Sequence, residues 1–148
     1  MKPFAFAAAA AALSFTVAGA AADALQDREA LMKERGGVMR ILGPIAQGKA
    51  PFDAAAVNSG LATLDANAQR AVAEVETLWP EGSDSGDTRA LPAIWADFDA
   101  FKAANEEYAA AAAAAAAAKP QDLAAFQAAF GPVAQGCGSC HETYRRPE

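Results

Sequence analysis

The chain has 148 residues, with 18 acidic and 12 basic side chains and a formal net charge of −6. This acidic balance argues against nucleic acid as a partner and slightly favours basic partners. The length suits one domain with one core, and abundant alanine with few β-branched runs favours helices.

Residues 1–22 have the pattern of a cleaved secretory signal. Lys2 supplies a positive start, residues 4–18 form an apolar run, and residues 20–22 fit the small-x-small cleavage rule. Asp23 is then the first mature residue. A membrane anchor is the alternative, but the apolar run is short for the ~20 residues that a span needs. No later stretch is long and apolar enough to span, so we expect export to the periplasm without a membrane span after cleavage.

Four helices are predicted in the mature domain, which spans residues 23–148. The first runs from about Asp23, its candidate N-cap, to Gln47. The glycines at 36–37 weaken its middle, and Pro44 should kink or end it. The residues that recur near helical spacing are Leu25, Arg28, Leu31, Met32, Val38, Met39 and Leu42.

The second helix begins at Asp53, whose side chain is a good N-cap, and reaches about Leu78. Its apolar residues alternate three and four apart, which is the spacing of a helix-bundle seam. They are Val57, Leu61, Leu64, Ala68, Val72, Val75 and Leu78. Residues 80–91 are rich in turn formers and are predicted as the longest loop. Their acidic residues do not have the spacing of an EF-hand calcium loop, so we expect a plain connection.

A third helix is predicted from Pro92, because proline suits the first turn of a helix. One broad stripe of mostly aromatic residues follows at helical spacing: Ile94, Trp95, Phe98, Phe101, Ala104 and Tyr108. Such a stripe is more often ordinary core than the wall of a cofactor pocket, and both interpretations stay open here. Residues 109–118 are an unbroken run of alanine that favours helix, and Pro120 ends it.

The fourth helix starts near Gln121 or Asp122 and continues into the stretch 137–141, Cys-Gly-Ser-Cys-His. The Gly-Pro pair at 131–132 should interrupt or kink it. The residues on its seam are Leu123, Phe126, Phe130, Val133, Cys137, Cys140 and Tyr144. Both cysteines therefore fall on the side of the helix that faces the core.

The C-x-x-C-H sequence is typical of covalent attachment of a c-type haem. Two cysteine thiols would add to the two haem vinyl groups and become thioethers. Residues three and four apart share one face of a helix, so Cys137 and Cys140 are neighbours there. His141 lies a full turn beyond Cys137 and is predicted as the proximal ligand of the haem iron. An exported chain fits this chemistry, because such attachment takes place outside the cytoplasm.

Three other hypotheses for the two cysteines stay open. They could form a structural disulfide, or a thioredoxin-like redox pair, although no βαβ context is visible for the latter. They could also bind zinc, but the chain has no other cysteine and no histidine besides His141. The third hypothesis for the whole protein, after the two that include haem, is therefore a helical protein with a disulfide and no haem.

Four helices with short connections predict an all-α fold, an antiparallel four-helix bundle. One haem c per chain would lie inside it, near the C-terminal end of the last helix. The sequence has no nucleophile–base pair and no glycine-rich phosphate loop. We therefore expect a mono-haem carrier of single electrons and not an enzyme.

The sequence resembles the class II c-type cytochromes, the cytochrome c′ family with its low-spin methionine-ligated branch. The segments that carry the resemblance are residues 28–33, 48–53, 94–95, 128–131 and 137–145. The resemblance implies a periplasmic four-helix bundle with redox partner proteins. Many relatives are antiparallel dimers packed through the first two helices, so a homodimer is compatible with the resemblance.

The resemblance also places Met32 at the distal side of the haem iron. In the low-spin branch a methionine there binds iron, and a thioether raises the reduction potential. In the cytochrome c′ branch an apolar side chain blocks the distal face, the iron is five-coordinate, and gases such as NO and CO bind. We expect Met32 to ligate the iron, with packing against the ring as the alternative. Met39 is the only other mature methionine and a weaker candidate.

Arg28 and Arg145 are the cations expected near the haem. A guanidinium pairs well with a carboxylate such as a haem propionate. The resemblance supports Arg28 in that role and places Arg145 near the proximal His141. The alternative for each arginine is an ordinary exposed surface charge.

Overall fold

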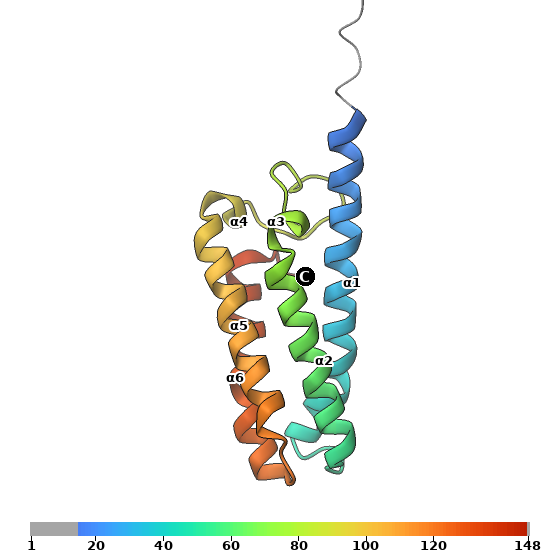
Figure 1. Ribbon diagram of the computed structural model, residues 1–148, viewed down its shortest axis with the longest axis vertical. Helices are drawn as coiled ribbons and strands as arrows, with labels where there is room; N and C mark the ends of the chain where they lie inside the picture. Colours follow the sequence, from blue (N-terminus) through green and yellow to red (C-terminus); the bar gives the residue numbers. More distant parts are fainter. Residues whose placement is uncertain (1–14, 148) are drawn as a thin grey trace, which may run out of the picture.

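The computed structural model describes residues 15–147, which form helices joined by turns and loops. The helices are α1 (Phe15–Ala46), α2 (Ala54–Ala73), α3 (Val75–Leu78), α4 (Ala93–Ala96), α5 (Phe98–Ala118) and α6 (Leu123–Tyr144). The four long helices pack side by side along one axis (Figure 1). The connections α1–α2 and α5–α6 lie at one end of this bundle, and the loop between α3 and α4 lies at the other. The predicted all-α four-helix bundle is confirmed.

The first helix extends further than predicted. It is already helical at Phe15, the first described residue, so Asp23 lies inside α1 and is not its N-cap. Residues 15–22 of the predicted signal continue the helix, whereas residues 1–14 lie outside the described part of the chain. Pro44 lies within the last turn, and Gly48 follows with a φ of +69° that helical residues do not adopt. The helix therefore ends just after its proline, as expected.

Aspartates cap the other three long helices. The Asp53 side chain accepts the backbone N–H of Ala56 at 2.7 Å at the start of α2, as predicted. At the start of α6, Asp122 accepts from Ala125 at 2.8 Å in the same way. These bonds satisfy backbone donors that would otherwise lack a partner in the first turn.

Two predicted helices are each divided into a long and a short piece. The second helix stops at Ala73, because Glu74 leaves helical geometry with φ −104° and ψ 12°, and the short α3 follows. The helix predicted from Pro92 has a break at Asp97 that was not predicted. Asp97 adopts φ −143° and caps α5, because its side chain accepts the Ala100 N–H at 3.0 Å. The loop between α3 and α4 lies where it was predicted.

The Gly-Pro pair at 131–132 does not interrupt α6, contrary to the prediction. Both residues are exposed, and Pro132 borders an open groove between α5 and α6, so its ring is not pressed against the neighbouring helix. The missing N–H of Pro132 leaves one carbonyl that water can reach. As a result, α6 carries the C-x-x-C-H residues in unbroken register with the apolar residues that precede them.

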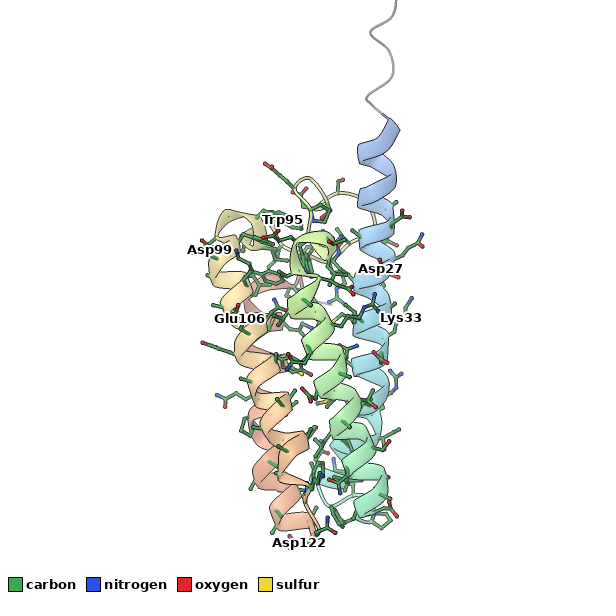
Figure 2. The ribbon with its side chains drawn as sticks, viewed as in Figure 1. Asp27, Lys33, Trp95, Asp99, Glu106 and Asp122 are labelled. Atoms are coloured by element: carbon green, nitrogen blue, oxygen red, sulfur yellow. The ribbon has the colours of Figure 1, made fainter. Side chains whose placement is uncertain are left out.

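Buried apolar residues gather at both ends of the bundle, and Figure 2 shows Trp95 and Asp122 at opposite ends. Near the short connections lies the apolar core: Leu42, Ile45, Val57, Leu61, Leu64, Ala68, Tyr108, Ala109, Ala112, Ala115, Phe126, Phe130 and Val133. Near the long loop lies the aromatic cluster, defined as Trp79, Trp95, Phe98, Phe101 and Tyr144. On α6, Val133 belongs to the apolar core and Tyr144 to the aromatic cluster. The C-x-x-C-H residues lie between the two.

The loop between α3 and α4 is fastened to the C-terminal end of α6. The backbone N–H of Leu91 donates to the Tyr144 carbonyl at 2.9 Å, and that of Arg146 donates to the Arg89 carbonyl at 2.8 Å. These bonds hold the last turn of α6 in place beside the loop. Among residues 15–147, no helix has both the length and the apolarity that crossing a bilayer requires.

Candidate functional site

The last two turns of α6 bring Cys137, Cys140 and His141 together. Both cysteines are free thiols and, like His141, are partly buried. The disulfide hypothesis is therefore not realised in this structure. Within residues 15–147, no three Cys, His, Asp or Glu side chains are grouped so as to hold a metal ion by themselves. The zinc hypothesis lacks its donors for that reason.

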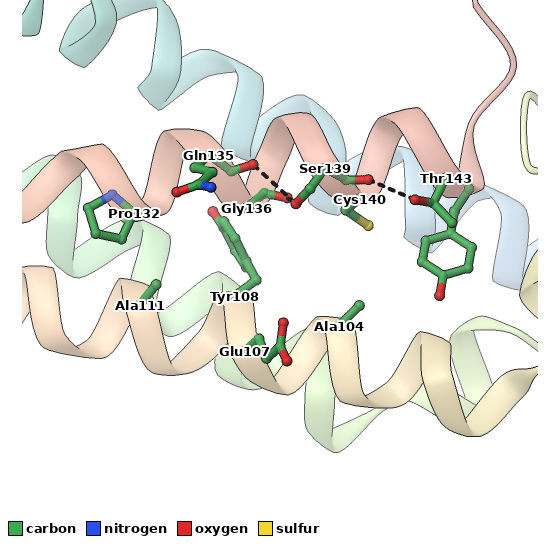
Figure 3. A pocket seen from close by; sticks show the side chains of 11 residues that line it. Ala104, Glu107, Tyr108, Ala111, Pro132, Gln135, Gly136, Ser139, Cys140 and Thr143 are labelled. Carbon is green, nitrogen blue, oxygen red and sulfur yellow. Dashed lines mark hydrogen bonds between the residues drawn. The ribbon is translucent and has the colours of Figure 1, made fainter.

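A groove of about 390 Å³ runs between α5 and α6 beside these residues (Figure 3). The side chain of Cys140 points into the space between the two helices. Small residues border it, namely Ala104 and Ala111 on α5 and Gly136 on α6. The volume lies in the range of about 300–1,000 Å³ that is usual for cofactor and ligand pockets.

Tyr108 crosses from α5 to α6 next to the first cysteine. Its ring packs so closely on Gly136 that a Cβ there would lie 3.2 Å from Tyr108 Cδ2. Figure 3 shows the ring pointing at this glycine. The tyrosine hydroxyl is buried and has no hydrogen-bond partner among the described residues. Burial, and then the neighbouring Cys137, raise the pKa of Tyr108 well above its usual value, so the hydroxyl stays protonated.

Arg35 of α1 reaches the same region from the opposite side. Its guanidinium carbon lies 4.5 Å from the centre of the Tyr108 ring, and its Nε donates to Oδ1 of Asn67. Asn67 is itself held, because its amide donates to the Leu31 carbonyl at 3.2 Å and to the Glu34 carboxylate. Arg35 Nη2 is buried and has no hydrogen-bond partner among residues 15–147. An unpartnered cationic nitrogen thus lies inside the bundle.

The surroundings keep the thiols and the imidazole uncharged. Burial raises the pKa of Cys137 and of Cys140, and the charge of Arg35 opposes this only in part. Burial lowers the pKa of His141, and the positive charges of Arg145, Arg35 and Arg89 lower it further. A neutral imidazole is the form that binds a metal ion.

Arg28 is buried at the long-loop end of α1, with 5% of its surface exposed. It donates to the Ser83 carbonyl at 3.0 Å and to Ser83 Oγ at 3.3 Å, and its guanidinium lies 4.4 Å from the centre of the Trp79 ring. Burial lowers the pKa of Arg28 from its usual value. The Trp79 ring in turn packs on Phe101, which packs on Tyr144. Arg28 is therefore linked to the end of α6 through the aromatic cluster, and it is not an exposed surface charge.

Arg145 is the C-cap of α6 and lies beside the predicted proximal histidine. Its backbone N–H donates to the His141 carbonyl at 3.1 Å, while its side chain is exposed. The chain also forms a short antiparallel bridge between Ala90 and Arg145. Arg145 is thus held near His141 by backbone contacts, with its guanidinium free to face solvent or a ligand.

The two candidate methionines lie in different surroundings on α1. Met32 is 39% exposed, although its neighbour Leu31 is buried. Met39 packs against the apolar core and borders a second groove, between α1 and α6, that also contains Phe130. Met32 is the methionine whose side chain is not committed to core packing.

Arg35 and Asn67 were not among the predicted site residues, although α1 carries a signal for the arginine. The inward residues of α1 alternate four and three apart, and two cations, Arg28 and Arg35, occupy this otherwise apolar seam. The full set is Ala24, Arg28, Leu31, Arg35, Val38, Leu42 and Ile45. A cation at a seam position is costly to bury and therefore marks a special environment. Asn67 has no comparable signal, because a single polar residue in α2 is equally consistent with a solvated face.

Comparison with known proteins identifies the family. Residues 23–145 match the family model described as cytochrome C′. The chain belongs to the cytochrome c′ family. Members of this family contain covalently attached haem c, and this chain is a haem c cytochrome and electron carrier.

Relatives and solved structures agree with this family assignment. The chain is 40% identical over 125 residues to cytochrome c-556 of Agrobacterium fabrum, covering 84% of this chain and 82% of that protein. It is 37% identical over 130 residues to cytochrome c-554 of Cereibacter sphaeroides, covering 81% and 96%. The structure of cytochrome c′ from Rhodopseudomonas palustris superposes with a TM-score of 0.76 at 34% identity, covering 85% and 98%.

The residues present fit a haem c. Two free thiols and a neutral imidazole lie on neighbouring turns of one helix, beside a groove of suitable size. Two buried polar groups near the site, Arg35 Nη2 and the Tyr108 hydroxyl, have no hydrogen-bond partner among residues 15–147. Buried polar atoms without partners are rare, so their presence here indicates a place made for a group with acceptors or negative charge.

Proposed function

We propose that this cytochrome carries single electrons in the periplasm, with haem attached through Cys137 and Cys140 and with His141 and Met32 as the two iron ligands. The observation on which the proposal depends is the position of the C-x-x-C-H residues. They lie on one unbroken helix, between two packed clusters and beside a groove that Cys140 lines. The family assignment supplies the cofactor class.

Each residue has a distinct task in this proposal. Bound haem supplies one iron that alternates between the ferric and ferrous states. Cys137 and Cys140 tether the ring through thioethers, and His141 offers a neutral nitrogen to the iron. Arg28 and Arg145 are proposed partners of the haem carboxylates or of the proximal side. The apolar core and aromatic cluster exclude water and keep the surroundings similar in both oxidation states.

Met32 is proposed as the distal ligand for two reasons. Its sulfur is a soft donor that suits haem iron and raises the potential. Its side chain is 39% exposed, so turning it towards the haem breaks no core packing. Met39 would have to leave the apolar core to do the same.

The same exposure supports a second candidate function, the binding of small gases such as NO or CO to five-coordinate iron. Met32 lies next to the inward-facing residues of α1 and is not one of them. Its apolar side chain would therefore also be stable packed against the haem ring, without binding the iron. The iron would then keep an open position.

The export prediction is part of the proposal. The family match begins at residue 23, which is the predicted first residue after cleavage.

We also propose redox proteins as partners. A homodimer packed through the first two helices, as the family resemblance allows, would be tested by sedimentation velocity.

The deciding experiment is the absorption spectrum of the ferrous holo-protein before and after CO is added. Met ligation predicts a sharp low-spin spectrum that CO does not change, because a protein ligand fills the sixth position. Met32→Ala should convert this spectrum to a high-spin form that shifts with CO. Met39→Ala is the matched control on the same helix and should leave the low-spin spectrum unchanged.

Other outcomes would redirect the proposal. A wild-type high-spin spectrum that shifts with CO would remove Met32 from the ligand set and favour gas binding. A colourless protein without covalent haem after denaturation would reject both functions.

A further inference from the structure

Arg35 is a cation held inside the bundle at the level of the cysteines. It approaches from α1, and its guanidinium carbon lies 4.5 Å from the centre of the Tyr108 ring, which packs on Gly136 directly before Cys137. The Tyr108 ring thus links Arg35 to the turn of α6 that carries the first cysteine. The haem, if attached as proposed, is bound at that turn.

Two contacts fix the orientation of Arg35. The Nε atom donates to Asn67, and the guanidinium carbon lies 4.5 Å from the centre of the Tyr108 ring. Asn67 is 3% exposed and is anchored to the Leu31 carbonyl. A guanidinium held over an aromatic ring and bonded at one edge has little freedom to turn out to solvent.

No carboxylate forms an ion pair with Arg35 among residues 15–147, and its buried Nη2 atom has no acceptor. The Glu34 carboxylate reaches Arg35 only through Asn67, which donates to Glu34 and accepts from Arg35 Nε. The other seam cation, Arg28, differs, because Ser83 accepts from both of its terminal nitrogens. A cationic nitrogen buried without an acceptor is costly, so the retention of Arg35 indicates an electrostatic role.

We propose that Arg35 raises the reduction potential of the haem by presenting a fixed positive charge to it. This inference depends on the proposed attachment site. Reduction adds one electron and makes the haem more negative by one unit, while no bond in the chain forms or breaks. A nearby fixed cation favours that state over the ferric one, and the effect is strong where water is excluded. The electron comes from the redox partner, or in the test from a chemical reductant.

The test is a spectroelectrochemical titration of the holo-protein with dithionite and ferricyanide. Arg35→Gln removes the charge and keeps a hydrogen-bond donor, and Arg35→Lys keeps the charge. Arg40→Gln is the matched control, because Arg40 is an exposed arginine on the same helix. We expect Arg35→Gln to disfavour reduction about tenfold, equal to about 59 mV for a one-electron couple. Arg35→Lys and Arg40→Gln should stay near the wild-type potential.

A second variant guards against loss of folding in Arg35→Gln. Arg35→Met keeps an apolar side chain of similar reach without the charge, and the potential of this variant should fall in the same direction. Unchanged potentials in both variants, or an equal fall in Arg40→Gln, would overturn the role of Arg35. The absorption spectrum separates this result from the proposed function, because a low-spin spectrum with covalent haem shows that the ligands and attachment remain.

Discussion

At the residue scale, several polar groups are placed in the interior at specific positions. Arg28 and Asn67 are nearly fully buried, and both have hydrogen-bond partners in the chain. The Nη2 atom of Arg35 and the hydroxyl of Tyr108 are buried without partners. Satisfied buried polar groups cost little, whereas unsatisfied ones each cost about 1–3 kcal/mol. These two groups lie in the region of Cys137, where the cofactor is proposed to bind, whereas a third unsatisfied atom, Asn58 Oδ1, lies near Pro120 at the end with the short connections.

The contact between Gly136 and Tyr108 gives a residue-scale prediction. Gly136→Ala would place a Cβ 3.2 Å from a ring that is itself 6% exposed and cannot easily move. We expect the free energy of unfolding to fall by about 1–2 kcal/mol, as in other overpacked sites. Denaturant unfolding of the holo-protein, followed by circular dichroism, measures this.

Gly138 provides the control for that prediction on the same helix. A Cβ at Gly138 meets nothing within 4 Å, so Gly138→Ala should stabilise α6 by about 0.5–1 kcal/mol through helix propensity. Equal stability of the two variants would show that the Tyr108 ring yields without cost.

At the element scale, helix ends follow local signals where a polar cap is available. The sequence predicts helix starts at Asp53 and at Gln121 or Asp122, and the Asp53 and Asp122 side chains each accept a backbone N–H in the first turn. Asp97 has the same chemistry, but the aromatic stripe continues through it in the sequence and hides the break. The break lets α4 present Ile94 to the interior while α5 starts on a new axis.

Removing the Asp97 cap is the element-scale prediction. Asp97→Ala should lower the free energy of unfolding by about 1 kcal/mol, because the Ala100 N–H loses its acceptor. Thermal unfolding would show a lower Tm. Asp99→Ala, two residues away, removes only an exposed pair with Lys102 and should change Tm little. A Tm for Asp97→Ala no lower than that of Asp99→Ala would contradict a capping role.

At the scale of the whole molecule, the bundle consists of two packed clusters with the proposed site between them. The apolar core joins α1, α2, α5 and α6 near the short connections. The aromatic cluster joins α3, α4, α5 and the end of α6 near the long loop. The region between the two contains the groove, the free thiols and the unpartnered Arg35 nitrogen. Apolar packing is thus least complete where the cofactor is proposed to lie.

Loss of the cofactor tests this arrangement. A variant with both Cys137→Ala and Cys140→Ala cannot form thioethers, so haem should be absent after denaturation and extraction. We expect a clear fall in the denaturant midpoint relative to the wild-type holo-protein, because a ligand that binds only the folded state stabilises it. A double variant with covalent haem, or one as stable as the wild type, would contradict this prediction.

The sequence by itself determined the number and order of the long helices, the Asp53 cap, the placement of Cys137, Cys140 and His141 on one helix face, and the family. These features depend on periodicity, capping and motif spacing, which act over a few residues and can be recognised in the printed chain. The family match and the helical structure confirm the fold that they predict.

Only the tertiary structure decided the breaks at Glu74 and Asp97 and the inward position of Arg35. Whether a helix bends or a cation turns inward depends on the partners that meet it from other helices. The energy of burying Arg35 is set by Asn67 on α2 and Tyr108 on α5. Neither residue is near it in sequence, so no local pattern contains that information.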